Sequence, residues 1–282
     1  MKYIYKTIIF WILSVLFTAV IAIYQRASGP TYPVKGSVTI NNEEIKYKLI
    51  RTDTTYIEPD SSEIKIKVLD NTITGSYNFR RYKSHDKWME NNMAMLREDS
   101  FLIANIPRQD TAGKIEYKIT LIGTDKEYLL EEDPIVMRYK GDVPKRILYP
   151  HIFLMFFAML FSTRTGIEVL IKGKYVFLYT TITLLLLIPG GMILGPIVQH
   201  YAFGAYWTGW PWGTDLTDNK TAIAFLGWIV AFILILFGKG KRKGWALVAS
   251  IVLLMVYLIP HSMFGSEIDH TESEGENIEV VE

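Results

Sequence analysis

Five apolar runs divide the chain, and they restrict the folds that it can adopt more than any other feature. As a helix, each run is long enough to cross, or nearly to cross, a hydrocarbon layer of about 30 Å. The runs extend over residues 7–24, 147–170, 175–198, 221–238 and 245–260. A stretch of mixed polarity separates the first run from the second. We therefore expect an α plus β membrane protein with five spans and one sizeable domain outside the lipid.

The first run, TIIFWILSVLFTAVIAIY, admits two interpretations. It is longer than the apolar core of about 7–15 residues that is typical of a cleaved signal peptide. This length favours an uncleaved transmembrane anchor over residues 1–25. Cleavage near Val20–Ala22 is the alternative.

Basic residues in the short loops predict the orientation. They lie before the first span and in the loops that join spans two to three and four to five: Lys2, Lys6, Arg164, Lys172, Lys174, Lys239, Lys241, Arg242 and Lys243. All fall on the cytoplasmic side if the N-terminus is inside, as the positive-inside rule requires. The domain (26–146), the loop at 199–220 and the acidic tail (266–282) then face outward. We expect the tail to be disordered and residues 147–265 to form a four-helix transmembrane bundle.

Composition excludes several kinds of site. The chain has no cysteine, which rules out disulfides, thiolate metal sites and cysteine nucleophiles. The net charge of +1 gives no electrostatic reason to expect nucleic acid as a partner.

Residues 26–146 contain short segments in which apolar and polar side chains alternate. They are VKGSVTI (34–40), EIKYKLI (44–50), EIKIKVL (63–69), TITGSYNF (72–79), FLIANI (101–106), KIEYKITLI (114–122) and PIVMRYK (134–140). A period of two is typical of strands with one buried face. Turn signals such as Asn41-Asn42 and Asp70-Asn71 separate the segments. The pattern predicts an antiparallel β-sandwich.

The stretch NIPRQDTAGKIEYKI (105–119) resembles the E–F corner of fibronectin type III and immunoglobulin-like domains. The resemblance implies that Tyr117 lies on a strand and that its hydroxyl bonds back to the preceding loop. It also implies a domain that binds or spaces rather than catalyses.

Another segment of the domain, RRYKSHDKW, is basic and aromatic. It could form a patch for a protein partner that contains Arg80, Arg81, His85 and Trp88. The alternative is a solvated strand end with one packed tryptophan.

Three histidines, His151, His200 and His261, lie at the predicted outer ends of spans two, three and five. Three imidazoles at one depth could bind Cu, Zn or a single haem. The architecture is similar to that of cytochrome b561-type proteins, but a second, inner haem would need histidines on the inner side, and there are none. The alternative is that these side chains only occupy the membrane interface.

The loop between spans three and four reads YAFGAYWTGWPWGTDLTDNKT. Tryptophan and tyrosine are typical of an interfacial belt, and Thr217, Asp218 or Asn219 could cap the next helix. We expect a structured lid on the outer end of the bundle. Its candidate residues are Trp207, Trp210, Trp212, Asp215 and Asp218.

Two features lie within the predicted spans. The segment IPGGMILGPIV (188–198) predicts either a broken helix of the kind that lines transporter sites or a kinked helix in which Gly191 and Gly195 permit close packing. Arg164 and Glu168 are spaced i, i+4 and are expected to pair.

Four blocks resemble a family of bacterial polytopic inner-membrane proteins with no assigned activity. They are RASGPTYPVKG (26–36), YPHIFLMFFAMLFSTRTGIE (149–168), GGMILGPIVQHYAFGAYWTGWPWGTDLTDNKT (190–221) and YLIPHSMFGSEID (257–269). The resemblance implies a bacterial inner-membrane protein in contact with lipid. We expect a non-enzymatic, accessory or scaffold component of a membrane complex, whose exported domain engages a protein partner. A metal- or haem-binding redox protein and a small transporter are the alternatives.

Overall fold

The computed structural model describes residues 2–55, 58, 60–213, 215–238, 242–260 and 268–271. It is an α plus β structure that divides into two compact units. The helical unit comprises residues 1–30 and 143–265, and the β unit comprises residues 31–142 and 266–282.

The helical unit begins with an apolar helix, α1 (Lys2–Ser28). Its other helices are α2 (Lys145–Leu170), α3 (Val176–Leu187), η1 (Ile188–Leu194), α4 (Gly195–Phe203), α5 (Leu216–Phe237) and α6 (Gly244–Leu258). Four helical stretches are long and apolar enough to cross a membrane: Tyr5–Ser28, Lys145–Leu170, Val176–Phe203 and Leu216–Phe237. The fifth predicted span corresponds to α6, which is apolar but has only 15 residues.

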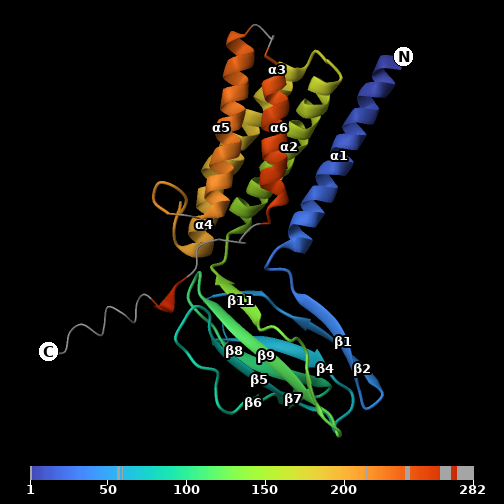
Figure 1. Ribbon diagram of the computed structural model, residues 1–282, viewed down its shortest axis with the longest axis vertical. Coiled ribbons are helices and arrows are strands. Elements are labelled where there is room, and N and C mark those ends of the chain that lie inside the picture. Colours follow the sequence, from blue (N-terminus) through green and yellow to red (C-terminus); the bar gives the residue numbers. More distant parts are fainter. Residues whose placement is uncertain are drawn as a thin grey trace, which may run out of the picture. The chain divides into compact units, whose positions relative to one another are not determined.

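Helix α2 packs against α1, α3 and α6, and α5 packs against α3 and α6 (Figure 1). Small residues bring α2 and α6 together, because a Cβ at Gly166 would lie only 2.7 Å from Oγ of Ser250. The Ser250 hydroxyl donates to the carbonyl of Ser162 at 2.8 Å. Close approach of small residues is a common way for apolar helices to associate.

The predicted irregularity in the third span is a π-helical segment, η1, and the helix continues on both sides of it. Pro189 and Pro196 stand at the second positions of η1 and α4, and because the helix is continuous each proline removes one backbone donor from its hydrogen-bond ladder. The close contact occurs at Gly190, where a Cβ would lie 2.8 Å from Cβ of Leu154 on α2. At Gly191 and Gly195 the nearest atoms are at 3.4 and 3.8 Å, so the expected close packing occurs one residue before the predicted GxxxG pair.

The β unit contains three sheets of mostly short strands (Figure 1). Its strands are β1 (Val34–Ile40), β2 (Glu43–Leu49), β3 (Thr52–Thr54), β4 (Ser61–Lys67), β5 (Thr74–Arg81), β6 (Met93–Ala94), β7 (Leu96–Glu98), β8 (Phe101–Pro107), β9 (Lys114–Ile122), β10 (Glu127–Leu129) and β11 (Ile135–Lys140). The sheet orders are β1-β2, β3-β11-β9-β5-β6 with β10 on β9, and β4-β8-β7. All seven predicted strands are confirmed.

Strands from all three sheets bury side chains in one apolar core, which includes Ile45, Ile66, Leu102 and Ile119. Alternation in β9 is complete, with every second residue buried. The prediction of purely antiparallel pairing is wrong at one place, because β3 pairs with β11 in parallel. After a short connection from β2, the chain leaves the sheet β1-β2. Strand β3 then joins the edge of the other sheet, beside β11.

Tyr117 is fully buried on β9, but its predicted hydrogen bond is wrong. Its hydroxyl donates to the carbonyl of Ile50 at 2.8 Å, which lies after β2 and far from the loop that precedes β9. Burial raises the pKa of Tyr117, so the hydroxyl keeps its proton and remains a donor. The tyrosine therefore connects two sheets instead of closing a local corner.

Part of the tail that was expected to be disordered is described, namely residues 268–271. There the amide of His270 donates to the carbonyl of Lys83 at 2.9 Å, and the hydroxyl of Thr271 bonds the carboxylate of Asp269 at 2.5 Å. The rest of the predicted tail lies outside the described residues.

Replacing Tyr117 by Phe should lower the unfolding free energy of the β unit by about 1–3 kcal/mol, because the buried carbonyl of Ile50 loses its donor. The measurement is urea-dependent proteolysis of the purified chain. Tyr128→Phe is the matched control, since that hydroxyl bonds Asp125 in an exposed contact. Equal losses for the two variants would contradict the importance of the Ile50 bond.

Candidate functional site

The segment between α4 and α5, residues 204–215, carries the clustered tryptophans; we call it the aromatic loop. Thr214 lies outside the described residues. The loop starts where Gly204, with φ of 84°, ends α4 in a left-handed conformation. Only glycine adopts this conformation at no steric cost.

The carboxylate of Asp218, in the first turn of α5, anchors the aromatic loop. Its Oδ2 accepts hydrogen bonds from the amides of Thr208 at 2.6 Å and Gly209 at 3.1 Å. The side-chain amide of Gln199 on α4 donates to the same oxygen at 3.0 Å. One acidic residue thus joins α4, the loop and α5, a role of Gln199 that the sequence analysis missed.

Asp215 is the residue that caps α5, and its Oδ1 accepts from the amide of Thr217 at 2.7 Å. The prediction that Thr217, Asp218 or Asn219 is the cap is therefore wrong. Asn219 instead accepts from the amide of Trp210 at 2.7 Å. Two of the three predicted caps, Asp218 and Asn219, instead accept hydrogen bonds from amides of the loop.

The anchored loop presents two tryptophans to its surroundings. Trp210 and Trp212 are 78% and 81% exposed, respectively. Trp207 is partly buried, and its indole N–H donates to the carbonyl of Trp210 at 3.2 Å. The acids of the aromatic loop and of α5 therefore bond local backbone amides, and the role of the loop as a lid stays a prediction.

Lys220, one turn into α5, is a buried cation at this end of the bundle. It is only 4% exposed, and its ammonium donates to the carbonyls of Ile259 at 2.8 Å and Pro260 at 3.5 Å, just after α6. These carbonyls lack helical partners because α6 ends there. The sequence analysis missed this contact.

The three candidate metal ligands have different environments. Nδ1 of His151 lies 2.9 Å from the carbonyl oxygen of Gly190 in η1, and the ring of His200 stacks on Tyr206 with centroids 4.1 Å apart. His261 lies outside the described residues. Among the residues that the structure describes, no group of three or more His, Asp or Glu is arranged to hold a metal ion. The three-histidine site stays a prediction.

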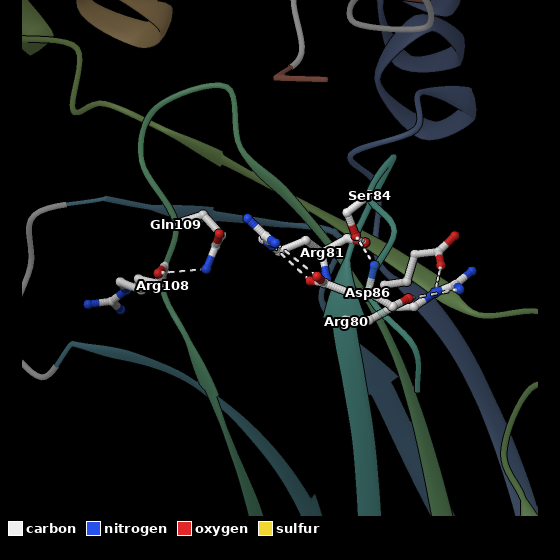
Figure 2. A network of polar contacts seen from close by, with 7 residues as sticks. Arg80, Arg81, Ser84, Asp86, Arg108 and Gln109 are labelled. Carbon is white, nitrogen blue, oxygen red and sulfur yellow. Dashed lines mark hydrogen bonds and ion pairs between the residues drawn. The ribbon is translucent and has the colours of Figure 1, made fainter. Parts of the chain in front are cut away.

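In the β unit, the predicted partner patch contains two charge pairs (Figure 2). Nε of Arg81 lies 2.7 Å from Oδ2 of Asp86, and a second bond of 2.8 Å makes the contact bidentate. Nε of Arg80 lies 2.7 Å from the carboxylate of Glu116. The guanidinium of Arg80 also lies 4.8 Å from the ring centroid of Trp88, whereas His85 is exposed. Both arginines are thus neutralised within the fold.

The guanidinium of Arg81 holds the pKa of Asp86 at about 2, well below its usual range. A carboxylate with a lowered folded-state pKa adds stability above its unfolded pKa of about 3.9, and this stability disappears as the pH falls through the folded value. The pair should therefore stabilise the strand end down to strongly acidic pH.

Comparison with known proteins found no match: no protein-family model, no curated protein and no solved structure is similar to this chain. A function must therefore be argued from the geometry of the two units.

Replacing Asp218 by Ala should release the aromatic loop, because two backbone amides lose a charged acceptor. Hydrogen exchange at Thr208 and Gly209 should accelerate about 10- to 100-fold. Asp133→Ala, a change at an exposed acid of the β unit, is the control. Unchanged protection in Asp218→Ala would mean that other contacts hold the loop.

Asp86→Asn should lower the unfolding free energy of the β unit by a constant amount between about pH 5 and pH 8. The difference from wild type should disappear as the pH falls from about 4 to about 2, since the wild-type carboxylate is then protonated too. Unfolding is measured by urea titration at each pH. In an Arg81→Gln background the same substitution should lose most of its effect; an undiminished effect would assign the low pKa to another cause.

Proposed function

We propose that the protein is a non-enzymatic scaffold of a bacterial inner-membrane complex and that its β unit binds a protein partner outside the cytoplasm. In this proposal the N-terminus is cytoplasmic, and α6 completes a set of five spans. The shared core of the three sheets supports a β-sandwich.

The exposed flanks of the helices support membrane insertion. Ile23 on α1, Leu185 on α3 and Phe237 on α5 are all largely exposed in the helical unit. In water such a number of exposed apolar side chains would favour aggregation, whereas lipid solvates them at no cost. The positive-inside pattern of the loops supports the orientation.

The observation that carries the partner proposal is an apolar patch on the sheet β4-β8-β7, formed by Leu69, Leu96 and Phe101. Leu96 is 54% exposed, and the other two are exposed as well. Leu96 pairs across the sheet with Ile103, which is on the same face as Phe101, two residues earlier. Phe101 pairs with Lys67, and Leu69 follows two residues later. The register therefore places the three side chains on one face of the sheet, where Lys67 and Glu98 stand opposite Phe101 and Ile103 is buried.

Exposed apolar side chains that share one face and are rimmed by charged ones typically mark a surface for protein association. By contrast, the charged side chains of the basic segment already pair internally, as Arg80 does with Glu116 and Arg81 does with Asp86. This contrast favours binding through the apolar patch over binding or chemistry at the basic segment.

A photo-reactive residue in place of Leu96 should give a discrete crosslinked product with another protein in native membranes. The same residue in place of Lys46, an exposed position on β2, is the matched control and should give none. Leu96→Asp should abolish the product formed from a photo-reactive residue at Phe101, because a charge in an apolar interface must be desolvated. Identical products from the patch and from the control would refute the proposed surface.

A further inference from the structure

A cleft with a volume of about 560 Å³ lies between α1, α2 and the turn that leads into α3. Its lining residues are Lys6, Thr7, Phe10, Arg164, Glu168, Ile171, Lys172, Gly173 and Lys174, and we call it the basic cleft. The volume falls within the range of about 300–1,000 Å³ that is usual for small-molecule sites. All of its walls belong to the helical unit.

Arg164 is the deepest cation of the basic cleft and is only 1% exposed. One of its terminal nitrogens lies 2.7 Å from Oε2 of Glu168. Within the part of the chain that the structure describes, its Nε has no hydrogen-bond partner. A buried donor without an acceptor costs about 1–3 kcal/mol, so an acceptor that reached Nε would stabilise the site.

The remaining charges of the basic cleft are also unbalanced. It contains four cationic side chains and a single carboxylate, Glu168. Glu168 is committed to the fold, because Oε2 faces Arg164 and Oε1 accepts from the amide of Tyr175 at 3.1 Å. Among the described residues, neither Lys6, Lys172 nor Lys174 forms an ion pair with a carboxylate. An anion is therefore the complementary ligand.

The position of the basic cleft favours a lipid as the source of this anion. It lies at the ends of three candidate spans, Tyr5–Ser28, Lys145–Leu170 and Val176–Phe203. Phe10 and Ile171 give it apolar walls beside the cations. The flank of α1 that continues from Lys6 exposes apolar side chains, including Ile9, Ile12 and Leu13. Cations beside an apolar flank match a phosphate headgroup with its acyl chains.

We propose that the basic cleft binds the phosphate of an anionic phospholipid, with Arg164, Lys172 and Lys174 contacting the headgroup and the acyl chains lying along α1. Basic pockets between transmembrane helices recognise such headgroups elsewhere. The inference rests on the membrane insertion that we propose above, and it is independent of the partner surface on the β unit.

The test is native mass spectrometry of the detergent-solubilised full chain with phosphatidylglycerol and phosphatidylcholine in competition. Wild type should retain phosphatidylglycerol preferentially. The double variant Lys172→Gln/Lys174→Gln should bind it at least ~10-fold more weakly, since each lysine near a headgroup contributes to binding. Both lysines are exposed, so their loss does not disturb the core.

The matched control is Arg242→Gln/Lys243→Gln, which removes the same charge from the connection before α6, outside the cleft. This control should bind phosphatidylglycerol as wild type does. A single change on another helix, Lys6→Gln, should weaken binding as well. Equal retention by wild type and all variants would overturn the proposal.

A separate arm adds inorganic phosphate to the wild-type chain. If phosphate is retained and the chain shows no preference for phosphatidylglycerol over phosphatidylcholine, the ligand is a free anion and the lipid proposal is wrong. Carbonate extraction of membranes separates the two proposals. A chain that is released by carbonate refutes membrane insertion itself, whereas a carbonate-resistant chain without lipid preference refutes only the lipid site.

Discussion

The burial of Arg164 is the constraint that organises the helical unit. A guanidinium removed from water needs a counter-charge and polar partners, and removing the counter-charge from such a pair costs about 3–5 kcal/mol. Glu168 supplies it one helical turn later at 2.7 Å and also accepts from Tyr175, which sets the turn between α2 and α3. The aromatic rings of Trp11 and Tyr179 lie 5.6 and 5.2 Å from the guanidinium carbon, which brings α1 and α3 onto α2.

The same requirement, that buried polar groups find partners, explains the other end of the bundle. Asp218 accepts hydrogen bonds from two amides of the aromatic loop, and Lys220 donates a hydrogen bond to a carbonyl that follows α6. His151 approaches the carbonyl of Gly190 in the π-helical segment. In the β unit, the hydroxyls of Tyr47 and Tyr77 donate to the backbone carbonyls of Leu130 and Asn105. Polar side chains in both units therefore satisfy hydrogen-bonding groups of the backbone.

Sequence patterns predicted the longer strands because seven or more alternating residues carry a clear period, as in β9 and β1. Strands of two or three residues, such as β6 and β10, have no period and were missed. The Arg164–Glu168 pair was predictable because its spacing places both side chains on one helix face. The helix cap was mispredicted because Asp215 and three later residues could all cap, and only the path of the aromatic loop selects among them.

By itself, the sequence determined the division into apolar helices and an alternating β region, since both properties depend on local period and length. It also determined which residues are candidates for recognition. Only the tertiary structure decided which of these candidates are already bonded, as Asp218 is to the aromatic loop, and which remain exposed, as Trp210 and Trp212 are. The physical reason is that a polar side chain's role depends on the donor or acceptor facing it, and here that group belongs to a segment distant in the sequence, as Ile50 is from Tyr117.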